Sequence, residues 1–254
     1  MALGVESAPS RFSDRVQRFL ERVEHRVARS PPEREAAFRL RYESYARNGL
    51  LRPRADGRIY DPPYDDAPNT WITTTFVDGE LAGTTRVNLG AREDAILPSL
   101  QVYPDVIAPR LRAGQVIVEF TRLAARLSLS SLYSELAYII MRPAYLAADH
   151  FDADLAVATP RAEHVAFYHR VFAGEVLCPP RDYPGLTVKL ACMGANYRSV
   201  RQNIEARYPF YKSTLAEREA LFGPRHSGFE SHARMKRSGG GFPERLGAAL
   251  ARSG

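Results

Sequence analysis

The sequence predicts an α/β protein in which helices cover a mixed, mostly antiparallel sheet. Two β-branched segments, 70–78 and 80–89, meet at Asp78-Gly79, a dipeptide typical of hairpin turns. A third strand is expected at 115–125, where apolar residues surround a few charges. Further along the chain, helical and strand patterns alternate, and this order favours an α/β layer arrangement.

The N-terminal region predicts two helices. Apolar residues at three- and four-residue steps indicate an amphipathic helix from Ser13 to Arg29, which is capped by Ser13 and ended by Pro31 and Pro32. This helix either packs on the core or serves as a docking or dimerisation helix. A second helix is expected from Glu33 to Arg47.

A polar loop at 52–69 follows the second helix, and its content of Pro, Asp and Gly argues against a regular element. Loops of this length inside a compact domain are often functional. Beyond the hairpin, the same patterns predict a short helix near 104–110, a helix at 130–150, a strand at 153–159, a helix at 160–172, a last strand at 186–195 and helical pieces near 197–208 and 213–222.

Composition divides the chain into an N-terminal helix region at 1–30, a core at 31–196, a C-terminal helical extension at 197–222 and a tail at 223–254. The tail is basic and rich in Gly and Ser, so we expect it to be disordered. No apolar run approaches the roughly 20 residues that span a bilayer. The N-terminus lacks the pattern of a secretory signal, and we expect a cytoplasmic protein.

The two cysteines, Cys178 and Cys192, have neither the spacing of a metal site nor that of a disulfide framework. We expect both to be buried apolar side chains, and we expect no metal and no permanently bound cofactor. The net charge of +6 comes almost wholly from arginine. A basic balance suits nucleic acid, a membrane surface or an acidic protein. No nucleic-acid-binding pattern occurs, so we expect no nucleic acid and favour an acidic protein partner, with membrane-surface association through basic regions as an open alternative.

Charged residues interrupt two of the predicted strands. Arg86 lies in GTTRVNL, and Glu119 and Arg122 lie in VEFTRL. Residues 119 and 122 of a regular strand point to opposite faces, so they can act together only if a bulge intervenes. The three charges indicate either a buried ion pair between strands or part of an active site.

A second group of polar residues joins the predicted helix to the acidic loop. The helix carries Arg41 and Tyr45, and the loop carries Asp61, Asp65 and Asp66. Arginines can grip a carboxylate and carboxylates can hold an ammonium group, which is what binding a free amino acid requires. A loop that is simply solvated is the alternative interpretation.

The succession RLRYESY, IYDPPYDD, DGELAGTTRVNL with LPS, VIVEFTRLA and EHVAFYHRVF resembles the N-acyl amino acid synthases, which are relatives of the acyl-homoserine lactone synthases. The resemblance covers roughly residues 33 to 195. It implies a GNAT-like, three-layer acyl-CoA N-acyltransferase fold, in which an acyl carrier protein presents its acyl-phosphopantetheine in a cleft between splayed strands. It also implies a charged cluster of Arg41, Asp61, Asp65, Arg86, Glu119 and Arg122.

The sequence departs from the lactone synthases in two places. No tryptophan follows the arginine-bearing helix, and Val118 replaces an aromatic residue before Glu119. These differences favour an ordinary amino acid over S-adenosylmethionine as the acceptor. The acetyl-CoA-binding pattern of ordinary GNAT enzymes is absent where LAARLSLSS stands, which favours acyl carrier protein over coenzyme A as the donor.

The expected function is therefore transfer of a fatty acyl group from acyl carrier protein to the amine of an amino acid. The attacking amine must be neutral, and Glu119 is the first candidate for its general base, with Asp61 or Asp65 as alternatives. Arg86 or Arg122 would hold the acceptor carboxylate or orient Glu119.

Tyr168 stands where the resemblance implies a tyrosine that protonates the leaving thiolate, although a core tyrosine fits equally. The apolar segment around 139–146 lines an acyl tunnel or belongs to the core. Two other functions stay open: a homoserine lactone synthase, and a binding module that recognises acylated carrier protein without turnover.

Overall fold

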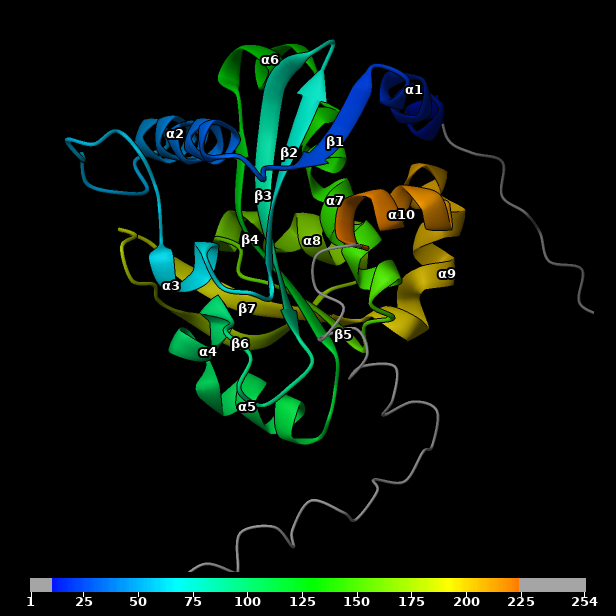
Figure 1. Ribbon diagram of the computed structural model, residues 1–254. Helices are drawn as coiled ribbons and strands as arrows, with labels where there is room; N and C mark the ends of the chain where they lie inside the picture. Colours follow the sequence, from blue (N-terminus) through cyan, green and yellow to red (C-terminus); the bar gives the residue numbers. More distant parts are fainter. Residues whose placement is uncertain (1–10, 224–254) are drawn as a thin grey trace, which may run out of the picture.

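The computed structural model describes residues 11–223, and their strands form one seven-stranded sheet of order β1-β2-β3-β4-β5-β7-β6 (Figure 1). The strands are β1 (Val23–Val27), β2 (Thr70–Val77), β3 (Glu80–Gly90), β4 (Ile117–Ala125), β5 (Leu155–Ala158), β6 (Glu175–Asp182) and β7 (Lys189–Asn196). Neighbouring strands are antiparallel except for β4 and β5. The predicted mixed, mostly antiparallel sheet is confirmed.

Helices cover both faces of this sheet. They are α1 (Arg11–Leu20), α2 (Pro31–Arg47), α3 (Pro62–Asp65), α4 (Pro98–Val102), α5 (Pro104–Arg112), α6 (Leu127–Leu132), α7 (Leu136–His150), α8 (Val165–Phe172), α9 (Tyr197–Arg207) and α10 (Leu215–Phe222), with 3-10 turns at Ala162–His164 and Pro209–Tyr211. Figure 1 shows α2 to α5 on one side of the sheet and α1, α7, α9 and α10 on the other. The two sides are called below the α2 face and the α7 face.

The predicted first helix is too long. Helix α1 ends at Leu20, and residues 23–27 form β1, which pairs with β2 from Val23 opposite Val77 to Val27 opposite Thr73. The side chains of β1 alternate in burial, as expected for an edge strand with one face on the core.

The two prolines after β1 begin α2 rather than end the helix before it. Ser30 caps α2: its hydroxyl accepts a hydrogen bond from the backbone N–H of Glu33, whose side chain in turn accepts from the N–H of Ser30. Pro31 occupies the first turn, where the missing N–H costs no hydrogen bond. The predicted helix at 33–47 is thus confirmed and starts two residues earlier.

Strand β6 was not among the strands predicted from the sequence. Pro179 and Pro180 are tolerated because β6 is an edge strand that pairs only with β7, and its register shifts between Cys178 and Arg181. Cys178 pairs directly with Cys192, and both are buried free thiols, as predicted. The predicted helix at 130–150 is divided into α6 and α7.

The two faces of the sheet have different cores. The largest apolar cluster lies on the α7 face and includes Trp71, Val87, Val118 and Ile140. On the α2 face, a small cluster around Phe38 and a second one beneath α4 and α5 leave the middle of the sheet to polar residues. Arg86, Asn88, Glu119 and Thr121 occupy this middle region, and all are buried.

The parallel strands β4 and β5 separate at their ends. They pair only from Ile117 opposite Leu155 to Phe120 opposite Ala158, where β5 ends while β4 continues to Ala125. Beyond Phe120, β4 is therefore bonded to β3 alone, and a space opens beside it. This is the splay between strands that the resemblance implied.

No helix within residues 11–223 is long and apolar enough to cross a membrane. The cytoplasmic location and the membrane-surface association stay predictions. The division at residues 30, 196 and 222 also stays a prediction, and the expected disordered tail lies outside the described residues apart from its first, Gly223.

Candidate active site

Five charged side chains form a chain of ion pairs on the α2 face. Arg41 Nη1 lies 2.9 Å from Asp65 Oδ1, and Arg86 Nη1 lies 3.3 Å from both Asp65 Oδ1 and Asp61 Oδ2. Arg122 completes the chain, with Nη2 2.7 Å from Asp61 Oδ2. The structure therefore brings together Arg41, Asp61, Asp65, Arg86 and Arg122, which the sequence predicted as members of one cluster.

A β-bulge puts Arg122 in this chain. The register of β3 and β4 shifts between Thr84 and Arg86, and Arg122 has a φ of 54°, a left-handed conformation that is rare for a residue other than glycine. Regular alternation would send Arg122 to the α7 face with Phe120. The bulge instead turns the Arg122 side chain to Asp61. Glu119 and Arg122 therefore lie on the same face of the sheet, as the sequence analysis required for them to act together.

Helix α3 holds the two aspartates in place. The backbone N–H of Asp61 donates to Asp65 Oδ2 at 2.8 Å, which ties the start of α3 to its last residue. Asp65 is almost completely buried. Burial alone would raise the pKa of Asp65, but Arg41 and Arg86 outweigh it and hold the pKa below its ordinary value.

Glu119 lies on the same face but has a different partner. Its carboxylate accepts hydrogen bonds from the backbone N–H of Ser99 at 3.0 and 3.1 Å and from the Ser99 hydroxyl at 2.7 Å. Burial raises the pKa of Glu119 to about 7, against the opposing effects of these hydrogen bonds and of Arg86. The bulge thus puts Glu119 and Arg122 on one face without joining them in one ion pair.

Beside the splayed end of β4 lies a cavity of about 320 Å³, called here the splay cleft. One wall is β4 from Phe120 to Ala125, and the opposite wall includes Arg161, His164 and Tyr168. Tyr45 also lines it, with its ring 5.8 Å from the guanidinium carbon of Arg122. Two predicted site residues, Tyr45 and Tyr168, therefore face one cavity together with Arg122.

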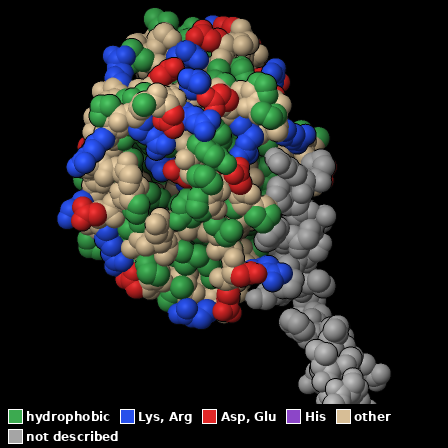
Figure 2. Space-filling model, turned by 60° about the vertical axis from the view of Figure 1, so that its left-hand side comes forward, with side chains coloured by type: hydrophobic (Ala, Val, Ile, Leu, Met, Phe, Trp, Pro, Cys, Tyr) green, Lys and Arg blue, Asp and Glu red, His purple; other side chains and the backbone are tan. Residues whose placement is uncertain are grey.

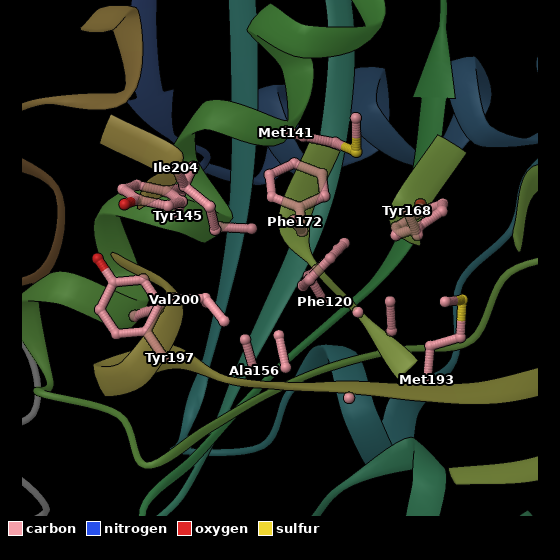
Figure 3. Close-up of a pocket in the computed structure, with 16 residues that line it drawn as sticks. Phe120, Met141, Tyr145, Ala156, Tyr168, Phe172, Met193, Tyr197, Val200 and Ile204 are labelled. Atoms are coloured by element: carbon pink, nitrogen blue, oxygen red, sulfur yellow. The ribbon is translucent and has the colours of Figure 1, made fainter. Parts of the chain in front are cut away.

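A second cavity, the apolar pocket, lies behind Phe120 and has a volume of about 40 Å³ (Figure 3). Figure 3 shows Phe120 between Phe172, Tyr168 and Ala156, with Val200 and Ile204 of α9 further along. Phe120 and Tyr168 stack with ring centroids 5.9 Å apart and line both the splay cleft and the apolar pocket. These two rings form the boundary between the two cavities.

A third cavity, the polar hollow, has a volume of about 590 Å³ and lies on the other side of Arg122. It is lined by Leu51, Arg52, Pro53, Arg54, Ile59, Asp61, Arg122, Gly185, Leu186 and Thr187. The segment 183–188 crosses here from β6 to the end of α2, because Thr187 donates from its N–H to Leu50 O at 2.9 Å and from its hydroxyl to Gly49 O at 2.8 Å. Leu186 and Arg122 line both the hollow and the splay cleft.

The predicted site residues differ in their access to these cavities. Arg41, Asp65, Arg86 and Glu119 are almost completely buried and line none of the three. The side chain of Asp61 keeps 22% of its surface exposed and is the carboxylate of the cluster that reaches a cavity. Figure 2 shows the side of the molecule that bears α2, where basic and acidic side chains are interspersed over the upper part.

Sequence reasoning missed Ser99 and Tyr183. Ser99 binds Glu119, and Tyr183 lines the splay cleft, where burial raises the pKa of its hydroxyl. Ser99 had a weak signal, since it stands in the LPS segment used for the resemblance. Tyr183 follows β6, which was itself missed, so nothing in the sequence pointed to it.

Comparison with known proteins identifies the family of this chain. The profile of the FeeM family, described as N-acyl amino acid synthase, matches residues 36–196. The chain belongs to this family. It is an acyltransferase, and its sheet and helices have the GNAT-like arrangement that the resemblance implied. No curated protein matches the chain at a significant level.

Among solved structures, FeeM, an N-acyl amino acid synthase from uncultured soil microbes, superposes with a TM-score of 0.60 at 18% identity, over 71% of this chain and 94% of FeeM. BjaI, a CoA-dependent acyl-homoserine lactone synthase, has a TM-score of 0.55 at 17% identity, over 84% of this chain and 98% of BjaI. The lactone synthase LasI has a TM-score of 0.52 at 14% identity, over 74% of this chain and 94% of LasI. At these identities the likeness concerns the fold alone.

Proposed function

We propose that the protein transfers an acyl group from the thioester of an acyl carrier protein to the amine of an amino acid. The observation that carries this proposal is the position of Arg122, which lines both the polar hollow and the splay cleft and binds Asp61 of the hollow. An acceptor amine in the hollow can meet a thioester in the cleft at this point. The geometry supports a two-substrate reaction better than simple binding.

The splay cleft and the apolar pocket suit the two parts of an acyl donor. The cleft is open and partly polar, as the pantetheine arm requires, while the pocket is lined by apolar side chains. At about 40 Å³ the pocket is smaller than a long acyl chain. A chain that passes Phe120 would therefore displace flexible lining residues such as Met141 and Met193.

Amide formation from an ammonium acceptor releases two protons: a base takes the first so that the nitrogen can attack, and the leaving thiolate takes up the second. The nitrogen attacks the thioester carbon, the carbon–sulfur bond breaks, and the products are the amide and the pantetheine thiol. Asp61 is suited to bind the acceptor ammonium and to receive its proton, because it reaches the hollow. Glu119, the first candidate from the sequence, is buried against Ser99 and is better suited to hold α4 in place.

The bulge in β4 and Tyr168 supply two further groups. A bulge leaves an extra residue out of the strand ladder, so a backbone N–H near Arg122 can bind the developing oxyanion. Tyr168 faces the cleft opposite this point. Burial raises the pKa of its hydroxyl, which therefore keeps its proton until a thiolate forms nearby.

A carrier-protein donor is supported by the basic side chains at the cleft. Arg161 lines its wall, and Arg170 is exposed on the same helix as Tyr168. An acidic carrier would be attracted to such a surface. BjaI is a CoA-dependent synthase, so acyl-CoA is the donor to test in parallel.

The experiment is an acceptor screen with purified full-length protein. Long-chain acyl carrier protein or acyl-CoA is incubated with each of the twenty amino acids or with S-adenosylmethionine, and products are identified by mass spectrometry. We expect N-acyl amino acid from the carrier-protein reactions and none from the Asp61→Asn variant. Methylthioadenosine with an acyl lactone would instead identify a lactone synthase, and tight carrier-protein binding without any product would identify a binding module.

A further inference from the structure

The polar hollow carries more positive than negative charge. Arg52, Arg54 and Arg122 line it, and Asp61 is its one acidic lining residue. Arg122 is already bound to Asp61, and Arg54 binds Asp56 at the rim. The surplus favours a ligand that brings a negative charge.

The two arginines that the sequence predicted for an acceptor carboxylate are committed elsewhere. Arg86 is buried, and its guanidinium binds Thr121 at 3.1 Å as well as both aspartates. Arg122 uses Nε and Nη2 for Asp61 at 2.8 and 2.7 Å. A carboxylate that displaced either bond would take from Asp61 one of its two arginine partners in a largely buried cluster, which is costly.

Arg54 is the better placed cation. Its Nε and Nη2 lie 3.2 Å from the carboxylate oxygens of Asp56, while Nη1 has no partner among residues 11–223. The backbone N–H of Arg54 donates to the hydroxyl of Tyr42, which fixes the loop at this residue. The pKa of Arg54 is raised chiefly by the hydrogen bond to Asp56, and Asp61 adds to the effect, so these charges act on one another across the hollow.

We infer that Arg54 binds the carboxylate of the acceptor while Asp61 binds its ammonium group, and that the acceptor is an α-amino acid with an uncharged side chain. This assignment rests on the proposed function. The two charges of an α-amino acid are separated by one carbon, and the hollow offers the cation Arg54 and the carboxylate Asp61 on the same wall segment, 51–61. Leu51, Ile59 and Leu186 give the side chain an apolar surface.

The same surplus of charge disfavours cationic acceptors. A lysine or arginine side chain, or the sulfonium of S-adenosylmethionine, would add a positive charge to a cavity that already has three arginines. These acceptors are expected to react poorly, in contrast to neutral amino acids of similar size.

The test compares three forms of the best acceptor in the screen: the free amino acid, its methyl ester and the amine that lacks the carboxyl group. For the wild type we expect the free amino acid to have the lowest KM. In Arg54→Gln its KM should rise about 10-fold or more with kcat within about twofold, as expected for one lost charge-assisted hydrogen bond, and the KM of the ester should not change. Calorimetric titration of the amino acid into the protein provides a second measurement, which needs no turnover.

Arg92→Gln is the matched control, because Arg92 pairs with Asp94 two residues along the chain, as Arg54 does with Asp56, and does not line the hollow. It should leave all three KM values unchanged. Equal losses for amino acid and ester in Arg54→Gln would overturn the assignment, as would unchanged kinetics or a selective loss only in Arg52→Gln. A wild type that acylates no amino acid contradicts the proposed function, and calorimetry then decides separately whether Arg54 binds the amino acid.

Discussion

Arg122 binds Asp61, which lies on the α2 face, although regular alternation along β4 would point the Arg122 side chain to the α7 face. The left-handed conformation of Arg122 at the bulge turns its side chain across, and Nη2 then lies 2.7 Å from Asp61 Oδ2. Such strained residues persist only where surrounding contacts fix them, and they cluster at functional sites. One local backbone feature thus places a cation, bound to the carboxylate of Asp61, where two cavities meet.

Removing the charge of Asp61 is expected to abolish most of the activity. Asp61→Asn keeps the size of the side chain but loses the proton acceptor and the strong pairing with Arg86 and Arg122. We predict a fall in kcat of at least about 100-fold, the lower range for loss of a general base. The measurement is the initial rate of thiol release from acyl carrier protein with a saturating amino acid.

Asp66→Asn provides the control for this prediction. Asp66 follows α3, and its carboxylate is half exposed and paired with Arg34 and Tyr60. Exposed pairs contribute little, so rate and stability should both stay near wild type. A comparable loss of activity in the two variants would show that the loop geometry matters rather than the charge at Asp61.

The stability of the protein should depend on the ionisation of Glu119. Burial raises its pKa from 4.5 to about 7, so between these values the unfolded chain has released a proton that the folded chain keeps. The free energy of unfolding therefore falls as pH rises from about 4.5 to about 7, by up to about 3 kcal/mol. Glu119→Gln cannot titrate and should lose less stability across this window.

Urea unfolding at pH 5 and pH 8 checks this expectation for the wild type, Glu119→Gln and the exposed Glu43→Gln. Glu43→Gln should follow the wild type at both pH values. Equal pH dependence in all three proteins would mean that Glu119 does not keep its proton in the folded state. The variant also tests whether Asp61 or Glu119 is the general base. A 100-fold loss of kcat in a stable Glu119→Gln would identify Glu119 as the base.

The sequence was sufficient for most of the fold, and its family resemblance implied a charged cluster that also included Glu119, which binds Ser99 instead. Arg41, Asp61, Asp65, Arg86 and Arg122 were predicted together, and they do form one chain of ion pairs. Their access to solvent could not be predicted, because it depends on how α2, α3 and α4 pack over the sheet. That packing buries Arg41 and Asp65 and leaves Asp61 at the surface of a cavity.

The two edge strands escaped sequence reasoning for different reasons. In β1, Val23 and Val27 fit the helical spacing of α1, and the competing two-residue alternation of VEHRV was too short to outweigh it. In β6, Pro179 and Pro180 argued against a strand, although an edge position tolerates them. Tyr183 was lost with β6, since its place in the cleft depends on where that strand ends.

Tyr168 and Tyr183 face the same cleft and allow a paired test of the thiolate-protonating role. Tyr168→Phe removes the hydroxyl but keeps the ring that stacks on Phe120 at 5.9 Å. We predict that it lowers kcat at least about 10-fold, with the KM for acyl carrier protein nearly unchanged. Tyr183→Phe should change kcat less than about threefold. The reverse order of effects would transfer the role to Tyr183.

The far end of the apolar pocket is expected to limit the length of the acyl chain. Val200 lines this end from α9, with Ile204 one turn further along the same helix (Figure 3). In Val200→Phe the larger ring would occupy space that a long chain needs, while a short chain would end before it. We predict that kcat/KM falls at least about 10-fold for a sixteen-carbon donor and less than about twofold for a six-carbon donor, on the scale of a few buried methylenes. Gln202→Phe, on the exposed side of α9, should change neither rate, and equal losses for both donors in Val200→Phe would mean that the acyl chain does not reach this pocket.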